Sequence, residues 1–219
     1  MSEGNQQKDS TPSLKGRAGE GSADSYLTIA APAEGQYTEK RSKFLAFAFP
    51  VRVVEEVKEL VDAYQKKYYD ARHVCYAYML GHERMTFRAN DNGEPSGTAG
   101  KPILGQINSN ELTDILIIVV RYFGGVKLGT SGLIQAYKAA AAEAIAAATI
   151  VERTVDERIA IAFEYTLMNQ VMRVVKEEEP AIVSQTFDND CLMTLSIRAS
   201  LMPRLRQRLQ KIEKLRIEE

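Results

Sequence analysis

Apolar and polar positions alternate in short runs through the first part of the chain, and this pattern predicts a sheet. Strands are expected at residues 26–30, 43–49, 73–80, 85–88 and 115–120. Pro50 closes the second of these strands, because proline cannot donate to a strand ladder. The run at 115–120 is aliphatic throughout, as expected for a central strand that is covered on both faces.

Two helices are predicted among these strands. In residues 53–68 apolar side chains recur at the spacing of one helical face, so this helix is expected to pack on the sheet. Residues 131–148 contain nine alanines, which favour helix and permit close approach to a neighbouring surface. This second helix is therefore expected to lie tightly across the sheet.

The pattern restarts after Glu152. A strand is expected at residues 158–165, a helix at 167–177 and a second strand at 181–187. A turn at 188–190, a third strand at 191–198 and a helix at 203–215 are expected to follow. This order fits a split-βαβ, ferredoxin-like domain whose final strand is short or missing. The sequence therefore predicts an α+β protein with two domains, residues 25–152 and 155–219, linked near residues 154–156.

Residues 1–24 are polar, rich in glycine and serine and without periodicity, so a disordered tail is expected there. The longest aliphatic run is far shorter than the roughly 20 residues of a membrane span, and the first residues lack the apolar core of a secretory signal. We therefore expect no membrane partner and a cytoplasmic location. Cys75 and Cys191 stand far apart in the sequence, which argues against a disulfide framework or a four-ligand zinc site.

The net charge of −1 argues against a protein that coats nucleic acid by bulk electrostatics, so any polyanion site would have to be local. Basic residues gather near the loops described next, at Lys40, Arg41, Lys43, Arg72, Arg88, Lys101, Arg121 and Lys127. They could form a positive patch on a neutral protein, or they could be scattered solvated charges.

Two glycine-rich loops flank the aliphatic strand. The first, DNGEPSGTAGKP at residues 91–102, holds three glycines and two prolines. The second, RYFGGVKLGTSGL at residues 121–133, runs directly into the alanine-rich helix. Glycine lets a backbone approach a ligand closely, and proline lowers the entropy lost on holding one conformation. Each loop could therefore be a site or simply a set of tight turns.

These loops, together with RSKF at residues 41–44 and ARHVCYAY at 71–78, closely resemble the IMPACT family in order and spacing over residues 25–150. The resemblance implies a cytosolic protein linked to regulation of translation, with no cofactor and no firmly attached enzymatic activity. It also implies an N-terminal fold like the second domain of ribosomal protein S5 and a C-terminal ferredoxin-like domain, which resembles the last domain of elongation factor G. Asn90 and Asn92 stand where the family more often has serine and aspartate, which puts a carboxylate metal site further in doubt.

A phosphate site is one possible use of the loops. The Walker pattern fails, because Pro95 and Pro102 occupy positions where a P-loop needs glycine and a hydroxyl residue. Residues 129–132, GTSG, stand at a helix start, where free N–H groups and the helix dipole favour an anion by about 0.3–1 kcal/mol. Thr130 or Ser131 could instead simply cap the helix.

Acid–base or nucleophilic chemistry near the loops has five candidates: His73, Cys75, Asp91, Glu94 and Ser96. A Cys–His pair is conceivable, but cysteine in an apolar strand is usually a small core residue, and His73 could either meet the glycine loop or bridge backbone groups. Asp91 is expected to shape an Asx-type turn, which leaves Glu94 free to fix an arginine or backbone N–H groups across the loop. No catalytic residue is assigned, and no metal site is expected.

Two functional hypotheses follow. The first is a binding protein that recognises RNA, the ribosome or a translation factor through the groove between the loops. The second is an enzyme or sensor for a phosphorylated small molecule at the helix start. An open basic groove with exposed Tyr122 or Phe123 would favour the first, and a closed pocket with converging polar groups the second.

The expected ligand-binding residues are Arg72, His73, Asp91, Gly93, Glu94, Gly97, Thr98, Gly100, Lys101, Arg121, Tyr122, Gly124, Gly125, Lys127, Gly129, Thr130 and Ser131. The last predicted helix offers a further possible contact for RNA or the ribosome. Its basic flank, Arg204, Arg208 and Lys211, could equally serve solubility.

Overall fold

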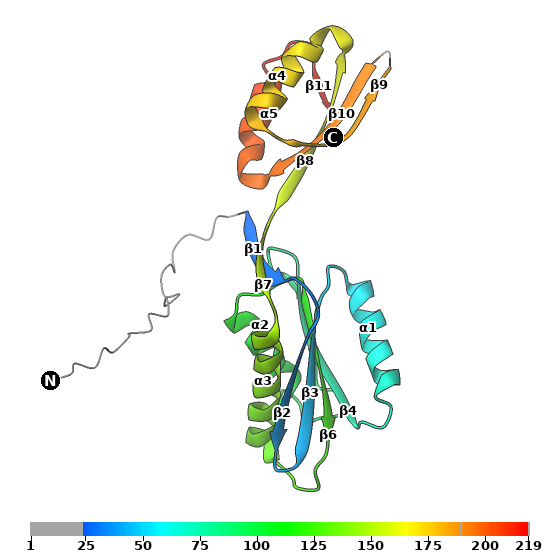
Figure 1. Cartoon of the computed structure of the whole chain (residues 1–219), viewed down its shortest axis with the longest axis vertical. Helices are drawn as coiled ribbons and strands as arrows, with labels where there is room; N and C mark the ends of the chain where they lie inside the picture. The colour runs from blue at the N-terminus through cyan, green and yellow to red at the C-terminus, as the bar shows by residue number, and fades with distance from the viewer. Residues whose placement is uncertain (1–23, 189, 219) are drawn as a thin grey trace, which may run out of the picture.

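The computed structural model describes residues 24–188 and 190–218, which form two sheets with separate hydrophobic cores and a two-stranded ribbon (Figure 1). We call residues 24–154 the N-terminal part and residues 156–218 the C-terminal part. The tail expected at residues 1–24 lies outside the described residues, apart from Asp24.

The N-terminal part contains seven strands and three helices within its described residues. They are β1 (Ser25–Ile29), β2 (Ala33–Glu39), β3 (Ser42–Pro50), α1 (Val54–Lys67), β4 (His73–Leu80), β5 (Thr86–Asn90), α2 (Gly100–Ser109), β6 (Ile115–Tyr122), α3 (Gly129–Ala147) and β7 (Ile150–Thr154). Five of the strands form an antiparallel sheet in the order β2-β3-β6-β4-β5. In Figure 1, α1 lies on one face of this sheet and α2 and α3 lie on the other.

The central strand β6 is buried on both faces, as its aliphatic sequence predicts. Ile115, Ile117 and Val119 belong to the core shared with α2 and α3. The alternating residues Leu116, Ile118 and Val120 belong to the core beneath α1. All six side chains are inaccessible to solvent, so β6 is the rigid element from which its own C-terminal end, and the loop after it, are positioned.

The alanine-rich helix α3 packs as closely on the sheet as its composition predicts. Ala136, Ala140 and Ala144 of this helix are fully buried. A Cβ atom on Gly35 of β2 would lie 2.3 Å from the backbone nitrogen of Ala144, so only glycine fits at that contact. Small residues on both elements bring helix and strand together and fix where the N-terminal end of α3 lies.

The C-terminal part has a four-stranded antiparallel sheet in the order β11-β8-β10-β9. Its elements are β8 (Asp156–Glu164), η1 (Tyr165–Leu167), α4 (Met168–Glu178), β9 (Ala181–Phe187), β10 (Asp190–Arg198), η2 (Ala199–Leu201), α5 (Met202–Leu209) and β11 (Arg216–Glu218). Both α-helices cover the same face of the sheet in Figure 1. Val171, Leu205 and Leu209 are among the residues that close the core of the C-terminal part.

The two parts meet at the ribbon that β1 forms with β7, and Val155 alone separates β7 from β8. The backbone carbonyl of Asp24 accepts a hydrogen bond from Val155 N at 2.7 Å. The carboxylate of Asp24 accepts hydrogen bonds from the backbone N–H of Ser200 at 3.2 Å and from the Ser200 hydroxyl. These contacts tie the residue before β1 to the β7–β8 junction and to η2, which follows β10.

Five elements differ from the sequence prediction in whole or in part. β2 is a half-exposed edge strand with polar residues, α2 begins within the first glycine loop, and β7 is short and largely exposed. The final strand of the C-terminal part is present but has only three residues, and α5 ends at Leu209 rather than at residue 215. No helix within the described ranges is long and apolar enough to cross a membrane.

Candidate functional site

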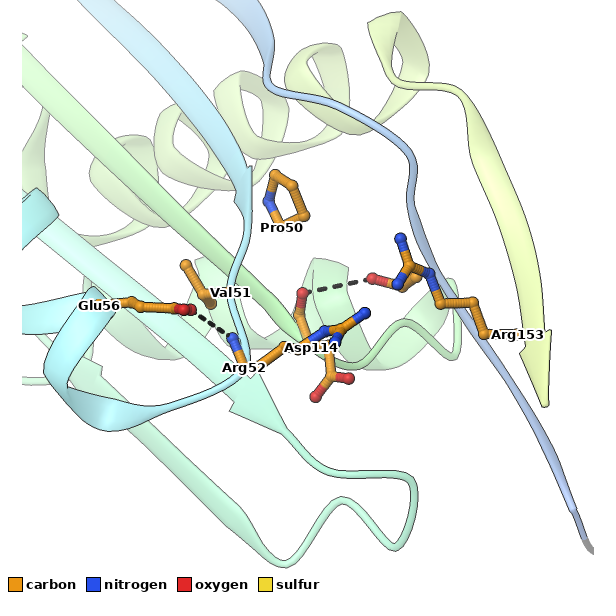
Figure 2. A pocket seen from close by; sticks show the side chains of 7 residues that line it. Pro50, Val51, Arg52, Glu56, Asp114 and Arg153 are labelled. Carbon is orange, nitrogen blue, oxygen red and sulfur yellow. Dashed lines mark hydrogen bonds between the residues drawn. The ribbon is translucent and has the colours of Figure 1, made fainter. Parts of the chain in front are cut away.

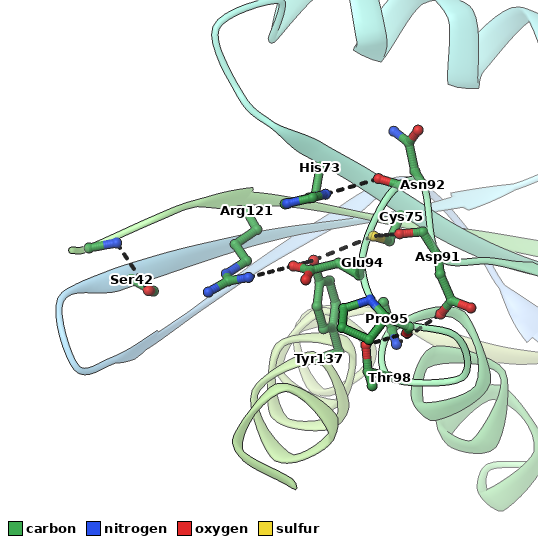
Figure 3. A network of polar contacts seen from close by, with 12 residues as sticks. Ser42, His73, Cys75, Asp91, Asn92, Glu94, Pro95, Thr98, Arg121 and Tyr137 are labelled. Atoms are coloured by element: carbon green, nitrogen blue, oxygen red, sulfur yellow. Dashed lines mark hydrogen bonds and ion pairs between the residues drawn. The ribbon is translucent and has the colours of Figure 1, made fainter. Parts of the chain in front are cut away.

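The two glycine-rich loops meet at one end of the five-stranded sheet. His73 begins β4 and pairs in register with Arg121, near the end of β6. The first loop leaves β5 and folds back over this end of β4, where the Nδ1 atom of His73 lies 2.9 Å from the backbone oxygen of Asn92. A carbonyl oxygen only accepts hydrogen bonds, so Nδ1 is the donor in this contact. Figure 3 shows how the side chains converge here.

Asp91 organises the first loop from within. One carboxylate oxygen accepts the N–H of Gly97 at 2.8 Å, and the other accepts those of Ala99 at 3.0 Å and Gly100 at 2.8 Å. Burial alone would raise the pKa of Asp91, but these three backbone donors outweigh it and lower the pKa. The carboxylate therefore stays charged and holds the first amides of α2, a helix that glycines and Pro102 would otherwise disfavour.

An Asx turn surrounds Asp91, but the side chain of Asn90 closes it, whereas the sequence analysis assigned that role to Asp91. The backbone N–H of Asn92 donates to Oδ1 of Asn90 at 2.8 Å, and the Asn92 side-chain amide donates to the carbonyl of Val74 at 3.1 Å. The hydrogen bonds of the turn and of the Asp91 carboxylate all lie within the first loop or join it to β4 and to the end of β5, so they stabilise the shape of the loop. Asp91 is thus a structural residue of the site, which is the role that its position favours.

A buried ion pair lies beneath the loop. Nη1 of Arg121 donates to Oε1 of Glu94 at 2.6 Å, and the two side chains are only 8% and 3% exposed. The hydroxyl of Tyr137, from α3, donates to the same oxygen at 2.9 Å, and burial raises the pKa of this hydroxyl so that it keeps its proton. The pair therefore joins the first loop, β6 and α3. Glu94 was expected to fix an arginine across the loop, and its partner is Arg121.

The ion pair does not use all the hydrogen-bond donors of Arg121. Its guanidinium carbon lies 5.5 Å from the ring centre of Phe44 and 5.7 Å from that of Phe123. Its Nε atom is buried and has no hydrogen-bond partner among the described residues. A buried charged donor without a partner is costly, so this atom is where a ligand or a water could add a hydrogen bond.

Cys75 lies behind the ion pair, and its thiol is unreactive. Its Sγ donates to the backbone oxygen of Asp91 at 2.9 Å and lies 3.4 Å from the hydroxyl of Tyr137. Burial raises the pKa of the thiol to about 12. The thiol is therefore protonated at neutral pH and is no nucleophile, since the thiolate is the reactive form.

A cavity of about 360 Å³ opens between the loops and the start of α3. Its lining residues are Arg72, His73, Glu94, Pro95, Arg121, Phe123, Lys127, Leu128, Gly129, Thr130 and Leu133. We call this the loop cavity. It combines three basic side chains and one acidic side chain with an apolar wall, and the ring of Phe123 is 49% exposed at its edge. The mixture suits a ligand with an anionic group and a flat apolar group.

The helix α3 presents its N-terminus to the loop cavity without a side-chain cap. It begins at Gly129, which has a φ of 71°, and no side chain makes a cap hydrogen bond there. The alternative that Thr130 or Ser131 caps this helix is therefore wrong, because both residues lie inside the first helical turn. The free N–H groups remain available to an anion, which the helix dipole also favours.

The expected site residues divide into three groups. Those that line the loop cavity are Arg72, His73, Glu94, Arg121, Lys127, Gly129 and Thr130. Those that shape the loops without lining it include Asp91, Gly93, Gly97, Thr98, Gly100, Gly124 and Gly125. Lys101, Tyr122 and Ser131 also lie outside the lining, and the Tyr122 hydroxyl donates to Asp70 at 2.9 Å.

The sequence analysis missed several residues of the site. Tyr137 was treated only as part of the helical pattern, and Pro95, Leu128 and Leu133 were not selected as ligand-binding residues. Phe123 was considered for stacking but was left out of the expected set. A polar aromatic residue one turn after Leu133, in a stretch of alanines, was the only signal for Tyr137, because its partner Glu94 lies 43 positions away.

A second cavity, of about 320 Å³, lies at the opposite end of β6 (Figure 2). Arg52 and Arg153 line it together with Glu56 and Asp114. The Thr28 hydroxyl donates to the backbone oxygen of Asp114 at 3.3 Å, and the backbone N–H of Arg52 donates to Glu56 at 2.7 Å. Its arginines are matched in number by carboxylates and it contains no residue of either glycine loop, so it serves below as a control location.

Two of the three cations of the basic flank, Arg204 and Arg208, form ion pairs with α4. Arg204 lies 3.0 Å from Glu178, and Arg208 lies 2.5 Å from Glu178 and also pairs with Glu177. These arginines are therefore committed to holding α5 against α4. Within the ranges that the structure describes, no group of three or more His, Cys, Asp or Glu residues is placed to hold a metal ion.

Comparison with known proteins decides the family. The Impact N-terminal domain matches residues 40–145. The IMPACT family member YvyE from Bacillus subtilis is 34% identical over 155 residues, which cover 71% of each chain. The IMPACT family member YigZ from Escherichia coli is 30% identical over 179 residues, which cover 81% of this chain and 88% of YigZ. The chain belongs to the IMPACT family.

A solved structure supports the same arrangement over nearly the whole chain. It is described as the crystal structure of a hypothetical protein, is 28% identical, and superposes with a TM-score of 0.67. The match covers 89% of this chain and 96% of that one. The IMPACT resemblance predicted from RSKF, ARHVCYAY and the two loops is thus confirmed, and the match to the solved structure extends beyond the glycine loops into the C-terminal part.

Proposed function

We propose that this IMPACT family protein is a cytoplasmic RNA-binding protein that acts on the ribosome or a translation factor in the regulation of translation. In this proposal a nucleotide occupies the loop cavity. Its phosphate lies at the N-terminus of α3 near Lys127 and Arg72, and its base stacks on Phe123. Base stacking on aromatic rings is the usual way in which single-stranded RNA is held.

The main support for the proposal is that Arg121 is buried and has an unsatisfied hydrogen-bond donor. This side chain is 8% exposed, lies beside the exposed ring of Phe123, and keeps one buried donor without a partner among the described residues. Glu94 neutralises the charge of Arg121, so the remaining positive side chains of the cavity are Arg72 and Lys127. An anion with an aromatic portion would satisfy the free donor, the helix N-terminus and the ring together.

The fold assignments belong to the same proposal. We assign residues 25–152 to a domain like the second domain of ribosomal protein S5. Residues 155–219 are assigned to a ferredoxin-like domain resembling the last domain of elongation factor G. The element order β8-α4-β9-β10-α5-β11 and the antiparallel strand order β11-β8-β10-β9 support the second assignment. Related folds occur in ribosome-associated proteins, which is consistent with an RNA ligand.

The test is binding of fluorescein-labelled single-stranded RNA to the full chain, followed by fluorescence anisotropy. Lys127→Ala should weaken binding similarly for RNAs of different sequence and lower the slope of log affinity against log salt by about one. Phe123→Ala should cost about 1–3 kcal/mol of binding free energy, because it removes a stacking surface. Arg153→Ala, in the cavity at the other end of β6, is the control and should change neither quantity.

Two results would contradict the proposal. One is unchanged RNA affinity in both Lys127→Ala and Phe123→Ala, with each variant shown by circular dichroism to be folded. The other is an equal loss in Arg153→Ala, which would mean that RNA responds only to total charge. Either outcome would remove the loop cavity as the RNA site.

One observation favours a second candidate function, an enzyme or sensor for a phosphorylated small molecule. Three buried polar groups, from Glu94, Arg121 and Tyr137, converge behind the loop cavity, as they do in metabolite sites. This alternative predicts that a nucleoside monophosphate raises the melting temperature of the protein by itself. It also predicts that inorganic phosphate competes for the site and that RNA adds no affinity beyond one nucleotide.

A further inference from the structure

A groove runs beside the loop cavity, between α1 and the β4–β5 hairpin, and has a volume of about 200 Å³. Lys58, Asp62 and Gln65 of α1 form one wall. Tyr76 and Tyr78 of β4 and Arg88 and Asn90 of β5 form the other, with Asn92 at its end. The register pairs Tyr78 with Arg88 and Tyr76 with Asn90, so aromatic and polar side chains stand opposite each other on one sheet face. We call this the α1 groove.

The charge of the α1 groove favours an anion. Lys58 and Arg88 are exposed and line it from opposite sides, whereas Asp62 is its single acidic lining residue. Neither cation forms an ion pair within 4.0 Å in the part of the chain that the structure describes. Two of the three arginines of α5, Arg204 and Arg208, are by contrast held by glutamates of α4. Unpaired cations facing each other across a groove are placed to contact a phosphate backbone.

The end of the α1 groove also offers hydrogen-bonding groups suited to a base. The Asn92 amide nitrogen is used by Val74 and the Asn90 amide oxygen by Asn92, whereas Oδ1 of Asn92 and Nδ2 of Asn90 have no partner within the described residues. The pair therefore presents one acceptor and one donor. Base edges of unstacked RNA are read by groups of this kind.

The α1 groove and the loop cavity are neighbours across a single hydrogen bond. Asn92 lines the groove, His73 lines the cavity, and the Asn92 backbone oxygen accepts from His73 Nδ1 at 2.9 Å. Gly93 follows Asn92 with a φ of 84°, and a Cβ atom there would lie 3.4 Å from the imidazole. The partition between the two hollows is thus a glycine-containing turn with no bulky side chain of its own on the His73 side.

We propose that the α1 groove is a second nucleotide subsite, so that the ligand is a single-stranded RNA segment that crosses Gly93 from the loop cavity to Lys58 and Arg88. This proposal rests on the proposed function of the loop cavity and names its ligand more closely. A free nucleotide would fill only the cavity. A strand would place successive phosphates near Lys127 and Arg88, with one base on Phe123 and another at Asn90 and Asn92.

The experiment compares a labelled nucleoside monophosphate with labelled single-stranded RNAs of increasing length on the full chain. Affinity should rise from one nucleotide to a short oligonucleotide. Arg88→Ala and Lys58→Ala should each weaken oligonucleotide binding by about fivefold or more, as for a lost charged contact, and leave mononucleotide binding unchanged. Lys127→Ala should weaken both ligands. Lys66→Ala is the matched control, because Lys66 is an exposed lysine of α1 that does not line the groove.

The outcomes separate this proposal from the one on which it rests. If Lys127→Ala weakens oligonucleotide binding while Arg88→Ala and Lys58→Ala do not, the α1 groove is not a subsite and the loop cavity still binds RNA. Equal losses in Lys58→Ala and Lys66→Ala would also overturn the groove, because binding would follow only the charge of α1. If none of the variants changes RNA binding, the proposed function itself fails.

Discussion

The two parts of the chain hold their charged residues in opposite ways. The N-terminal part has ten glycines, and its main ion pair, Arg121 with Glu94, is buried beneath glycine-rich loops. The C-terminal part has no glycine within its described residues, and the ion pairs that join its α4 to α5 set a largely buried Glu178 against the more exposed Arg204 and Arg208. Glycine lets backbone pass close over buried polar groups, whereas side-chain packing alone leaves charges at the rim.

The comparison indicates which charged side chains are available to a ligand. In the C-terminal part Arg204 and Arg208 pair with glutamates of α4, so two of the three cations of the basic flank are neutralised. In the N-terminal part a buried arginine has an unsatisfied donor, and exposed cations on two sides of the first loop have no acidic partner within the described residues. The buried, unsatisfied donor of Arg121 therefore supports the N-terminal part as the proposed binding half.

Removing one carboxylate from each part should expose the contrast most strongly. Glu94→Ala leaves Arg121 charged and buried without its partner, so the free energy of unfolding should fall by about 3–5 kcal/mol. Glu178→Ala should cost clearly less, because Arg204 and Arg208 can turn to solvent. Urea denaturation of both variants measures this, and equal losses would show that the two kinds of ion pair are energetically alike.

The consecutive glycines of the second loop test how far backbone packing shapes the site. A Cβ atom on Gly124 would lie 2.1 Å from the backbone carbon of Arg41, so Gly124→Ala should lower stability by about 3 kcal/mol or more. Gly125 has open space around it but a φ of 85°, so Gly125→Ala should cost about 1–2 kcal/mol through backbone strain. Thermal unfolding of the two variants is the measurement. A reversed order would mean that the loop relaxes away from Arg41.

Asp91 should give the N-terminal part a distinct response to acid. Its pKa is lowered in the folded protein, so its contribution to stability is present above the unfolded value of about 4 and is lost as the pH falls through the lower folded value. Asp91→Asn should therefore lower the free energy of unfolding by about 2 kcal/mol at neutral pH, and this difference should shrink in acid.

The control for this prediction lies in the C-terminal part. Hydrogen bonds from Arg208 and Arg173 lower the pKa of Glu177, but this carboxylate is at the surface. Glu177→Gln should thus have a smaller effect that fades with added salt, whereas the effect of Asp91→Asn should be nearly independent of salt. Stability measured against pH at two salt concentrations distinguishes them. A salt-sensitive Asp91→Asn would argue against a carboxylate shielded by backbone donors.

Much of the element order could be predicted from the chain because local patterns carry it. The aliphatic run of β6, the helical spacing of α1 and the alanines of α3 each report burial through residues close in sequence. α2 was missed because Gly100, Pro102 and Gly105 disfavour a helix locally, and the compensating carboxylate of Asp91 acts only once the loop has folded. β2 was missed because its polar edge position hides the alternation.

The sequence by itself determined the family, the two glycine loops and the need for Glu94 to find a basic or backbone partner, since these are properties of residue types in order. Only the tertiary structure decided that this partner is Arg121, that Tyr137 joins it, and that Thr130 and Ser131 do not cap α3. It also decided which cations form ion pairs: Arg204 and Arg208 of α5 meet glutamates from α4, whereas Lys58 and Arg88 meet no carboxylate within the described residues. Such pairings depend on side chains that are distant in the chain and close in space, so no local pattern can reveal them.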